Sequence, residues 1–315
     1  MSVIVQGPVI GGPEKAGHER LTWRALESVR RVFPGAQVIL STWSGSDLRK
    51  LEADTIVCST DPGSIVCKRA GTEDYVNGVN RSIISTLAGL RAATRPYAVK
   101  LRSDCELIHD GMLAHLEAHS ERCDEFRVFT DRIICGELFS RDPYITSFLF
   151  HPADVFHFGR TDDLLRLWDQ PLAPAEDTER WHESGFNRPW VMTEGLPIRY
   201  VPAQYLWITA LKKAGHDFSL RYCMELPHSL VGASELSLLN NFSLIDERSL
   251  GLAFPASFLR ASTDATYSRR TWQKLHEMYC VRRDPRELAK RSRRVAARAV
   301  LRKLSYALAR LKWKA

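Results

Sequence analysis

Two carboxylates two residues apart, Asp104 and Glu106, are the strongest chemical signal in the sequence, and Lys100 and Arg102 precede them. On an extended segment, residues i and i+2 point to the same side. Facing carboxylates repel each other unless a cation lies between them. We therefore predict that Asp104 and Glu106 bind a divalent cation, Mg²⁺ or Mn²⁺, and that the two basic residues contact phosphates. The alternative is a solvated acidic turn.

The acidic triplet follows one of several short apolar segments that are typical of strands. Apolar runs bounded by turn residues predict strands at residues 3–5, 38–40, 55–58 and 97–101. Apolar residues at helical spacing predict helices at 19–32, 46–52, 80–94 and 203–214. The alternation of strands and helices favours an α/β fold with a parallel sheet.

Ligands of parallel sheets bind beyond the carboxyl ends of the strands. The residues that we expect there to contact the ligand are Gln6, Gly7, Pro8, Thr42, Asp61, Arg102 and Ser103. Asn80 is the expected N-cap of the helix at 80–94, and a helix N-terminus attracts anions. Arg81 then either contacts a diphosphate or pairs with Asp104. The alternatives are ordinary turns and, for Arg81, an exposed position on the helix.

Six segments of the chain are characteristic when taken together: residues 3–9, 77–90, 97–104, 131–133, 158–168 and 204–207. Together they resemble the WavE family of lipopolysaccharide-synthesis proteins. More distantly, the order of strand, Asn-Arg helix, strand and acidic triplet is similar to that of GT-A glycosyltransferases, whose acidic motif holds a metal on the sugar-nucleotide diphosphate. Here that motif is Asp-Cys-Glu instead of Asp-x-Asp. Ala203 stands where the resemblance would place an acid before Gln204.

The resemblance implies a GT-A-like, mostly parallel sheet flanked by helices, and the charge pattern described below adds a basic helical tail at the C-terminus. It also implies glycosyl transfer from a nucleotide-sugar donor to a lipid-linked or lipid A–core glycan acceptor. An inverting transferase needs a base for the acceptor hydroxyl, and our candidates are Asp154 and Glu194, with His151 and His157 nearby. A sugar-1-phosphate nucleotidyltransferase and a non-catalytic, membrane-docked scaffold of polysaccharide assembly are the alternatives.

Charge is distributed unevenly along the chain. The whole chain carries +7, whereas residues 286–315 contain eleven Lys and Arg and one acid, a net +10, which leaves about −3 for residues 1–285. The tail has leucines on one helical face, at positions 301, 304, 308 and 311. This pattern predicts an amphipathic helix on an anionic membrane surface. The alternative is a helix packed on the body by its leucines. Nucleic-acid binding is not expected, because no recognised fold supports it.

We divide the chain into a nucleotide-sugar-binding half at 1–110, an acceptor-binding and catalytic half of the same domain at 111–285, and the tail at 286–315. No apolar run approaches the roughly 18 residues of a membrane span, and the first residues do not resemble a signal peptide. The seven cysteines are scattered and form no CxxC motif, which favours a reducing compartment. We therefore expect a cytoplasmic protein, peripheral on the inner face of the cell membrane.

Overall fold

The computed structural model describes residues 1–12, 20–67, 74–116, 121–177, 198–255, 258 and 265–314. A seven-stranded sheet with the order β3–β2–β1–β6–β9–β8–β10 forms its centre. The strands are β1 (Ser2–Gln6), β2 (Gln37–Trp43), β3 (Thr55–Ser59), β6 (Tyr97–Arg102), β8 (Ile133–Gly136), β9 (His157–Arg160) and β10 (Phe242–Ile245). Only β9 runs antiparallel to its neighbours β6 and β8. The predicted α/β fold with a mostly parallel sheet is confirmed.

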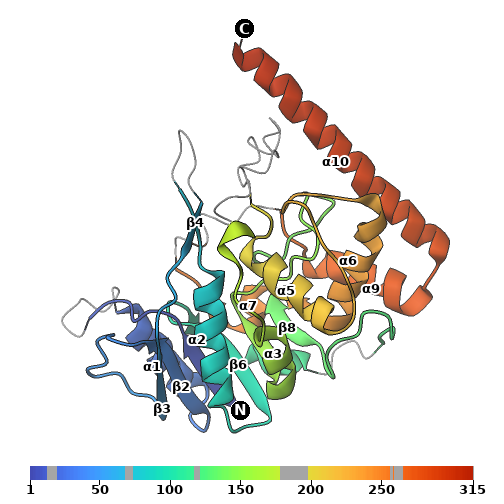
Figure 1. Cartoon of the computed structure of the whole chain (residues 1–315). Helices are drawn as coiled ribbons and strands as arrows, with labels where there is room; N and C mark the ends of the chain where they lie inside the picture. Colours follow the sequence, from blue (N-terminus) through green and yellow to red (C-terminus); the bar gives the residue numbers. More distant parts are fainter. Residues whose placement is uncertain are drawn as a thin grey trace.

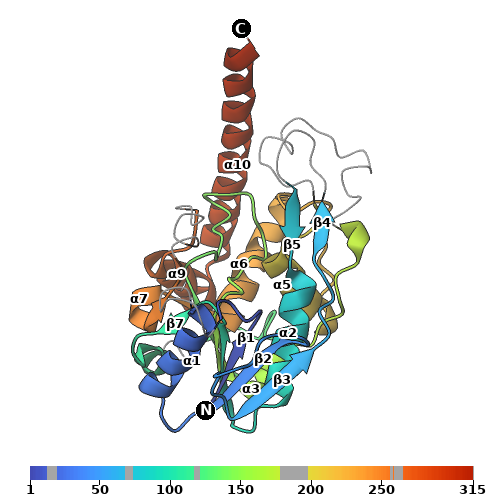
Figure 2. The ribbon, with the colours of Figure 1, turned by 90° about the vertical axis from the view of Figure 1, so that its left-hand side faces the viewer.

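Helices cover both faces of this sheet (Figure 2). On β1, Val3 and Val5 pack with α1 (Leu21–Val32), while Ile4 points to the other face, as the alternation of side chains on a strand requires. The second face is covered by α2 (Val79–Arg91), α3 (Thr161–Trp168), α5 (Pro202–Lys213), α6 (His228–Asn241) and α9 (Arg269–His276) (Figure 1). Helix α2 lies so close to the sheet that a Cβ at Gly89 would come within 2.4 Å of Ile4 Cγ2.

Smaller elements surround this core. Two antiparallel pairs are formed by β4 (Ile65–Cys67) with β5 (Tyr75–Asn77), and by β7 (Glu106–Leu107) with β11 (Leu252–Ala253). The short helices are Gly111–His115, Ala175–Asp177, α7 (Glu247–Leu250) and Glu277–Arg282. Of these elements, β4, β5 and β7 lie near the predicted site.

The predicted helix at 46–52 is wrong. This segment is a loop in which the Asp47 carboxylate accepts hydrogen bonds from the backbone and guanidinium of Arg49, and Lys50 adopts a left-handed φ of 59°. Local side-chain bonds of this kind compete with helix formation. The strands β8, β9 and β10 were not expected, because each is only four residues long and lacks a clear alternating pattern.

The basic tail is a single helix, α10 (Pro285–Lys314), which packs on the body at its beginning and then projects away from it (Figures 1 and 2). Val295 and Ala299 are buried where α10 lies along α6. The first half of the predicted tail is therefore part of the folded body. Within the described part of the chain, no helix has both the length and the apolar character needed to cross a membrane.

Candidate functional site

A cavity of about 360 Å³ lies at the carboxyl ends of β1 and β6. From β1 the chain continues to β2 and β3 on one side, whereas β6 lies on the other side. The cavity is thus at the point where the strand order reverses, which is where open α/β sheets bind their ligands. It is lined by Gln6, Gly7, Pro8, Trp43, Asp61, Ser64, Val76, Gly78, Arg81, Ser82, Ser85, Arg102 and Ser103.

The backbone after β1 forms one wall of the cavity. Gly7 has a φ of +126°, and a Cβ at this position would lie 2.9 Å from Ser103 Oγ. The Gly7 N–H donates to Ser41 O (3.0 Å), while the Ser103 hydroxyl donates to Pro8 O (2.7 Å). Only glycine combines this φ with so close a neighbour, so the predicted residues Gly7, Pro8 and Ser103 form one rigid corner.

The first two turns of α2 form the opposite wall. Gly78, Arg81, Ser82 and Ser85 lie on one face, at the helical spacing i, i+3, i+4 and i+7. Ser85 Oγ donates to Gln6 Oε1 (2.6 Å). Gln6 is only 4% exposed, and its side-chain amide, held at Oε1 by Ser85, lines the cavity. The two serines were missed, although the polar stripe at a helix start was a readable signal.

Arg81 and Asp61 form a bidentate ion pair at the edge of this cavity. Nε of Arg81 lies 2.7 Å from Oδ1 and Nη2 lies 2.6 Å from Oδ2, while Nη1 donates to Ser64 Oγ (2.7 Å). The hydrogen bond from Arg81 lowers the pKa of Asp61, and the same bond raises the pKa of Arg81. Arg81 therefore pairs with Asp61, and the alternative pairing with Asp104 is wrong.

Arg102 is the second guanidinium that lines the cavity. It makes a bidentate bond to Asp104, with Nε to Oδ1 at 2.9 Å and Nη2 to Oδ2 at 2.7 Å, and it stacks over Phe258 at 4.7 Å. Burial lowers the pKa of Arg102, but the hydrogen bond and charge of Asp104 outweigh burial and raise it above the ordinary value. Both guanidinium groups stay charged.

The expectation that Asp104 and Glu106 face a common cation does not fit their positions. The chain turns after β6, with the Cys105 N–H donating to Arg102 O (3.0 Å), so the triplet is not one extended segment. The Asp104 carboxylate pairs with the Arg102 guanidinium. Glu106, the first residue of β7, pairs instead with Arg24 on α1 (2.6 Å). Among the described residues, no three His, Cys, Asp or Glu side chains are placed to hold a metal ion.

Three further predicted contacts lie away from the cavity. Lys100 is buried: its Nζ donates to the backbone oxygens of Asp154 and Val155 and lies 4.9 Å from the centre of the Trp168 ring. Burial lowers the pKa of Lys100 to about 8. This lysine joins β6 to the backbone of residues 154 and 155 and does not line the cavity.

Thr42 and Asn80 also have structural roles. Thr42 is fully buried, with its hydroxyl 3.3 Å from Ser46 Oγ. Asn80 lies inside α2 and exchanges hydrogen bonds with the backbone of Ala173, which lies 93 residues further along the chain. The N-cap of α2 is Gly78 instead.

Of the two predicted bases, Asp154 lies at the edge of the sheet where β6 has its carboxyl end. It precedes β9, whose His157 pairs with Lys100 of β6, and its charge acts on both Lys100 and Arg102. No hydrogen bond from a described residue reaches its carboxylate, which is partly exposed. It does not line the cavity itself. Glu194 lies outside the described residues.

The two nearby histidines are unsuited to proton transfer. His157 is buried, with Nε2 2.9 Å from Ala153 O and Nδ1 accepting from Trp168 Nε1 (3.1 Å). Burial lowers the pKa of both His151 and His157 to about 3.

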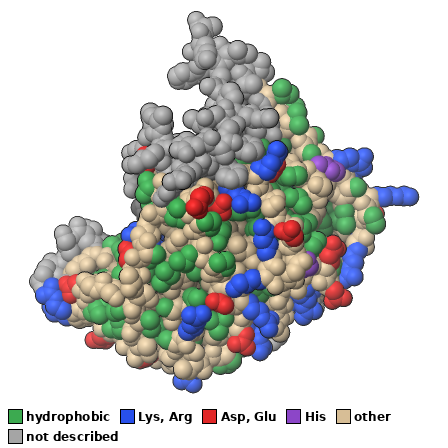
Figure 3. Space-filling view, in the orientation of Figure 1, with side chains coloured by type: hydrophobic (Ala, Val, Ile, Leu, Met, Phe, Trp, Pro, Cys, Tyr) green, Lys and Arg blue, Asp and Glu red, His purple; other side chains and the backbone are tan. Residues whose placement is uncertain are grey.

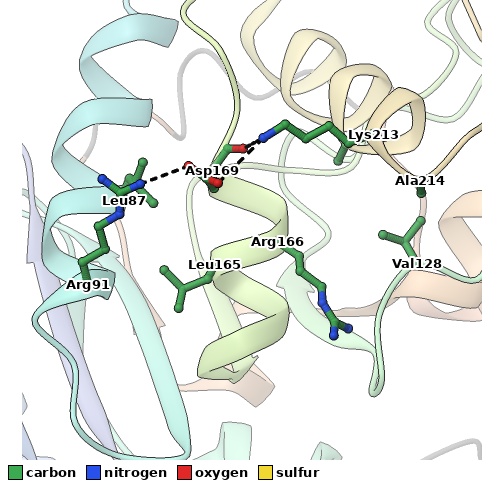
Figure 4. A pocket seen from close by; sticks show the side chains of 9 residues that line it. Leu87, Arg91, Val128, Leu165, Arg166, Asp169, Lys213 and Ala214 are labelled. Atoms are coloured by element: carbon green, nitrogen blue, oxygen red, sulfur yellow. Dashed lines mark hydrogen bonds and ion pairs between the residues drawn. The ribbon is translucent and has the colours of Figure 1, made fainter.

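A second cavity, of about 530 Å³, lies between α2, α3 and α5 (Figure 4). Asp169 lies between Arg91 (3.2 Å) and Lys213 (3.8 Å), and Arg166 points away from this group. Its floor is apolar, formed by Leu87, Val128 and Leu165 among others. Because it lies among helices and not at strand ends, we take the first cavity as the candidate active site.

Comparison with known proteins adds one firm assignment and a number of distant likenesses to solved structures, of which three are described. A search of curated proteins finds no match. A cytidylyltransferase from Leptospira borgpetersenii is 13% identical, with a TM-score of 0.31 over 62% of this chain and 73% of that one. A nucleoside-diphosphate-sugar pyrophosphorylase from Vibrio cholerae is 12% identical, with a TM-score of 0.34 over 82% and 100% of the two chains.

A mannosyltransferase from Pyrobaculum calidifontis, in complex with GDP-Man and Mn²⁺, is 13% identical, with a TM-score of 0.32 over 95% and 85% of the two chains. Likenesses this distant do not establish a shared activity. The family model for WavE lipopolysaccharide synthesis, in contrast, matches residues 1–305. The chain therefore belongs to the WavE family of lipopolysaccharide-synthesis proteins.

Proposed function

We propose that this protein is a glycosyltransferase that moves a sugar from a nucleotide-sugar donor to a lipopolysaccharide or other surface-glycan acceptor. The observation that carries this proposal is the cavity between the ends of β1 and β6, with Arg81 and Arg102 among its lining residues. Membership of a lipopolysaccharide-synthesis family supports it.

In this account the donor phosphates lie against the start of α2, where the helix dipole and Arg81 favour negative charge. Arg102 lies at the end of β6 on the other side of the cavity. Guanidinium groups bind phosphate oxygens in a bidentate manner, and Asp61 and Asp104 hold them in place beforehand. The phosphates would compete with these carboxylates for the same N–H donors.

The transfer forms a bond from an acceptor hydroxyl oxygen to the anomeric carbon and breaks the bond from that carbon to the donor phosphate. The nucleotide leaves with the bonding electrons, stabilised by Arg81 and Arg102. Asp154 is our candidate to accept the proton of the hydroxyl, because its carboxylate is partly exposed at this edge of the sheet.

A divalent cation would neutralise the donor phosphates further. The carboxylates of Asp104 and Glu106 do not form a joint ligand set in this structure, because each pairs with a different arginine. We therefore assign the phosphate charge to the two guanidinium groups, and no step depends on a metal.

The proposal is tested in two stages. First, thermal unfolding is followed with a panel of UDP-, GDP-, CMP- and dTDP-sugars, because a ligand that binds only the native state raises its stability. Second, the stabilising donor is incubated with lipopolysaccharide core acceptors, and nucleotide release is measured. We expect Asp154→Asn to lower turnover by roughly a hundredfold or more and to leave donor affinity unchanged.

Other outcomes would identify the alternatives. Release of pyrophosphate from a nucleoside triphosphate and a sugar 1-phosphate would indicate nucleotidyl transfer. Stabilisation by no nucleotide at all would favour a scaffold.

For the acceptor we propose a lipid-linked or lipid A–core glycan, met at the inner face of the cytoplasmic membrane.

A further inference from the structure

In its second half, α10 carries three large apolar side chains on the face that points away from the body, whereas Arg293 lies on this face in the first half. Val300, Leu301 and Leu304 are 56%, 58% and 55% exposed. At 3.6 residues per turn, they lie roughly opposite Val295 and Ala299, which are buried against the body. The alternative in which the tail packs through its leucines is therefore wrong for Leu301 and Leu304.

The direction of α10 is fixed by polar contacts on its buried face. Arg291 lies 2.8 Å from Glu235 of α6 and 3.1 Å from Asp142. About three turns later, Arg302 donates to Tyr144 O (2.7 Å) and Ser147 Oγ (3.2 Å). Because both contacts hold the same segment of helix, the apolar face cannot rotate toward the body without breaking buried ion pairs.

The charge of α10 identifies the surface that this face fits. Arg293, Arg294 and Arg298 are exposed, and the one acid of residues 286–315, Glu287, pairs with Lys290 (3.5 Å). Figure 3 shows acidic and basic side chains mixed over the visible surface of the body. A helix with a net charge of +10 repels a second copy of itself and is attracted to an anionic surface.

Helix α10 starts on the flank of the molecule beside α6 and projects toward the side to which the carboxyl end of β1 points (Figures 1 and 2). The N-terminus, where β1 begins, lies at one end, and the C-terminus of α10 lies at the other (Figures 1 and 2). The cavity is at the far end of β1, beyond Gln6, and is thus displaced in the direction in which α10 points.

We propose that α10 binds an anionic lipid bilayer through Val300, Leu301 and Leu304, with the flanking arginines among the lipid headgroups. A helix with an apolar stripe between basic residues lies in the plane of such an interface. Each basic residue near the surface adds to the attraction, and salt weakens it. The proposal does not depend on the transfer reaction.

Co-sedimentation of the full chain with vesicles tests this proposal. We compare vesicles of phosphatidylglycerol and phosphatidylcholine with vesicles of phosphatidylcholine alone, at low and high salt. We expect binding to the anionic vesicles only, and a loss of at least roughly tenfold in affinity for Leu301→Ser with Leu304→Ser. The double variant Arg293→Gln with Arg294→Gln should weaken binding to the anionic vesicles mainly at low salt.

The matched control replaces two similarly exposed apolar residues elsewhere, Ile108→Ser with Leu172→Ser, which are 55% and 47% exposed. This control should bind as the unaltered protein does, and circular dichroism checks that all variants are folded. Equal binding of the α10 variant and the control would overturn the proposal. So would a dimer, measured by sedimentation equilibrium without vesicles, that only the α10 leucine variant disrupts.

Discussion

The guanidinium of Arg81 meets both carboxylate oxygens of Asp61, at 2.7 and 2.6 Å, although the two residues are 20 positions apart. The pair joins the start of α2 to the loop after β3, and both residues line the candidate donor cavity. Their side chains are 43% and 35% exposed, so the pair adds only about 0–1 kcal/mol to stability. The pair therefore contributes little to folding, and in the proposed function Asp61 orients the Arg81 guanidinium at the cavity.

Arg81→Ala should lower the affinity for the donor nucleotide by roughly tenfold or more, because a charge-assisted bond to phosphate is lost. The melting temperature should change little. Calorimetric titration measures the affinity, and Arg91→Ala on the same helix is the control, since Arg91 lies at the second cavity. Equal affinities of these two variants would show that Arg81 is an ordinary surface residue that does not contact the donor.

Gly7→Ala should lower the free energy of unfolding by about 1–3 kcal/mol and weaken donor binding. An alanine at φ +126° is strained, and its Cβ would press on Ser103 Oγ. Gly35→Ala is the control, because a Cβ there meets nothing within 4 Å. Urea unfolding measures both variants, and comparable stabilities would show that the corner after β1 adapts to a side chain.

Glu106→Gln should leave the donor affinity within about twofold in the presence of either Mn²⁺ or EDTA, an effect below 0.5 kcal/mol. The reason is that Glu106 pairs with Arg24 on α1 and not with Asp104. The same titrations on Asp104→Asn provide the comparison, since Asp104 holds Arg102. If Glu106→Gln removed a Mn²⁺-dependent gain in affinity, the carboxylate would have to turn from Arg24 to a shared cation.

We expect His157 to make the folded protein less stable in acid. Burial, followed by the charge of Lys100, lowers its pKa from 6.5 to about 3. Between these values the unfolded chain binds a proton that the folded chain does not. Stability is therefore lost as the pH falls below 6.5, by up to about 1.4 kcal/mol per pH unit for this group.

His157→Phe should be less stable at neutral pH, because Trp168 Nε1 loses its acceptor, but should show a shallower loss on acidification. Urea unfolding at a series of pH values below 6.5 measures the slope. Replacement of the exposed His228 by Gln should leave the slope unchanged. Other buried groups titrate in every variant, so a slope that His157→Phe does not alter would place the acid sensitivity elsewhere.

The residues at the strand ends could be predicted from the sequence, because neighbouring residues alone mark where each strand stops. Gln6, Gly7 and Pro8 interrupt an apolar run, and Arg102 and Ser103 follow another, so the sheet brings them together once the strands are parallel. Seven of the predicted contacts line one cavity, and all of them except Arg81 on α2 follow a strand.

The remaining site contacts depend on distant partners that the local pattern does not contain. Asparagine is a common N-cap residue, but the side-chain oxygen of Asn80 accepts a hydrogen bond from the Ala173 N–H instead. Lys100 alternates with Val99 and Leu101 on β6, so its side chain enters the opposite core face, beside Trp168. The i, i+2 argument for Asp104 and Glu106 assumed an extended chain, whereas the structure turns between them.

A co-crystal structure with the nucleotide sugar that most raises thermal stability tests the central claim most directly. We predict that the donor phosphates lie between the ends of β1 and β6, within hydrogen-bonding distance of the Arg81 or Arg102 guanidinium and close to the Gln6 amide. A nucleotide bound instead between α2, α3 and α5, beside Arg91 and Lys213, would contradict the assignment of the active site.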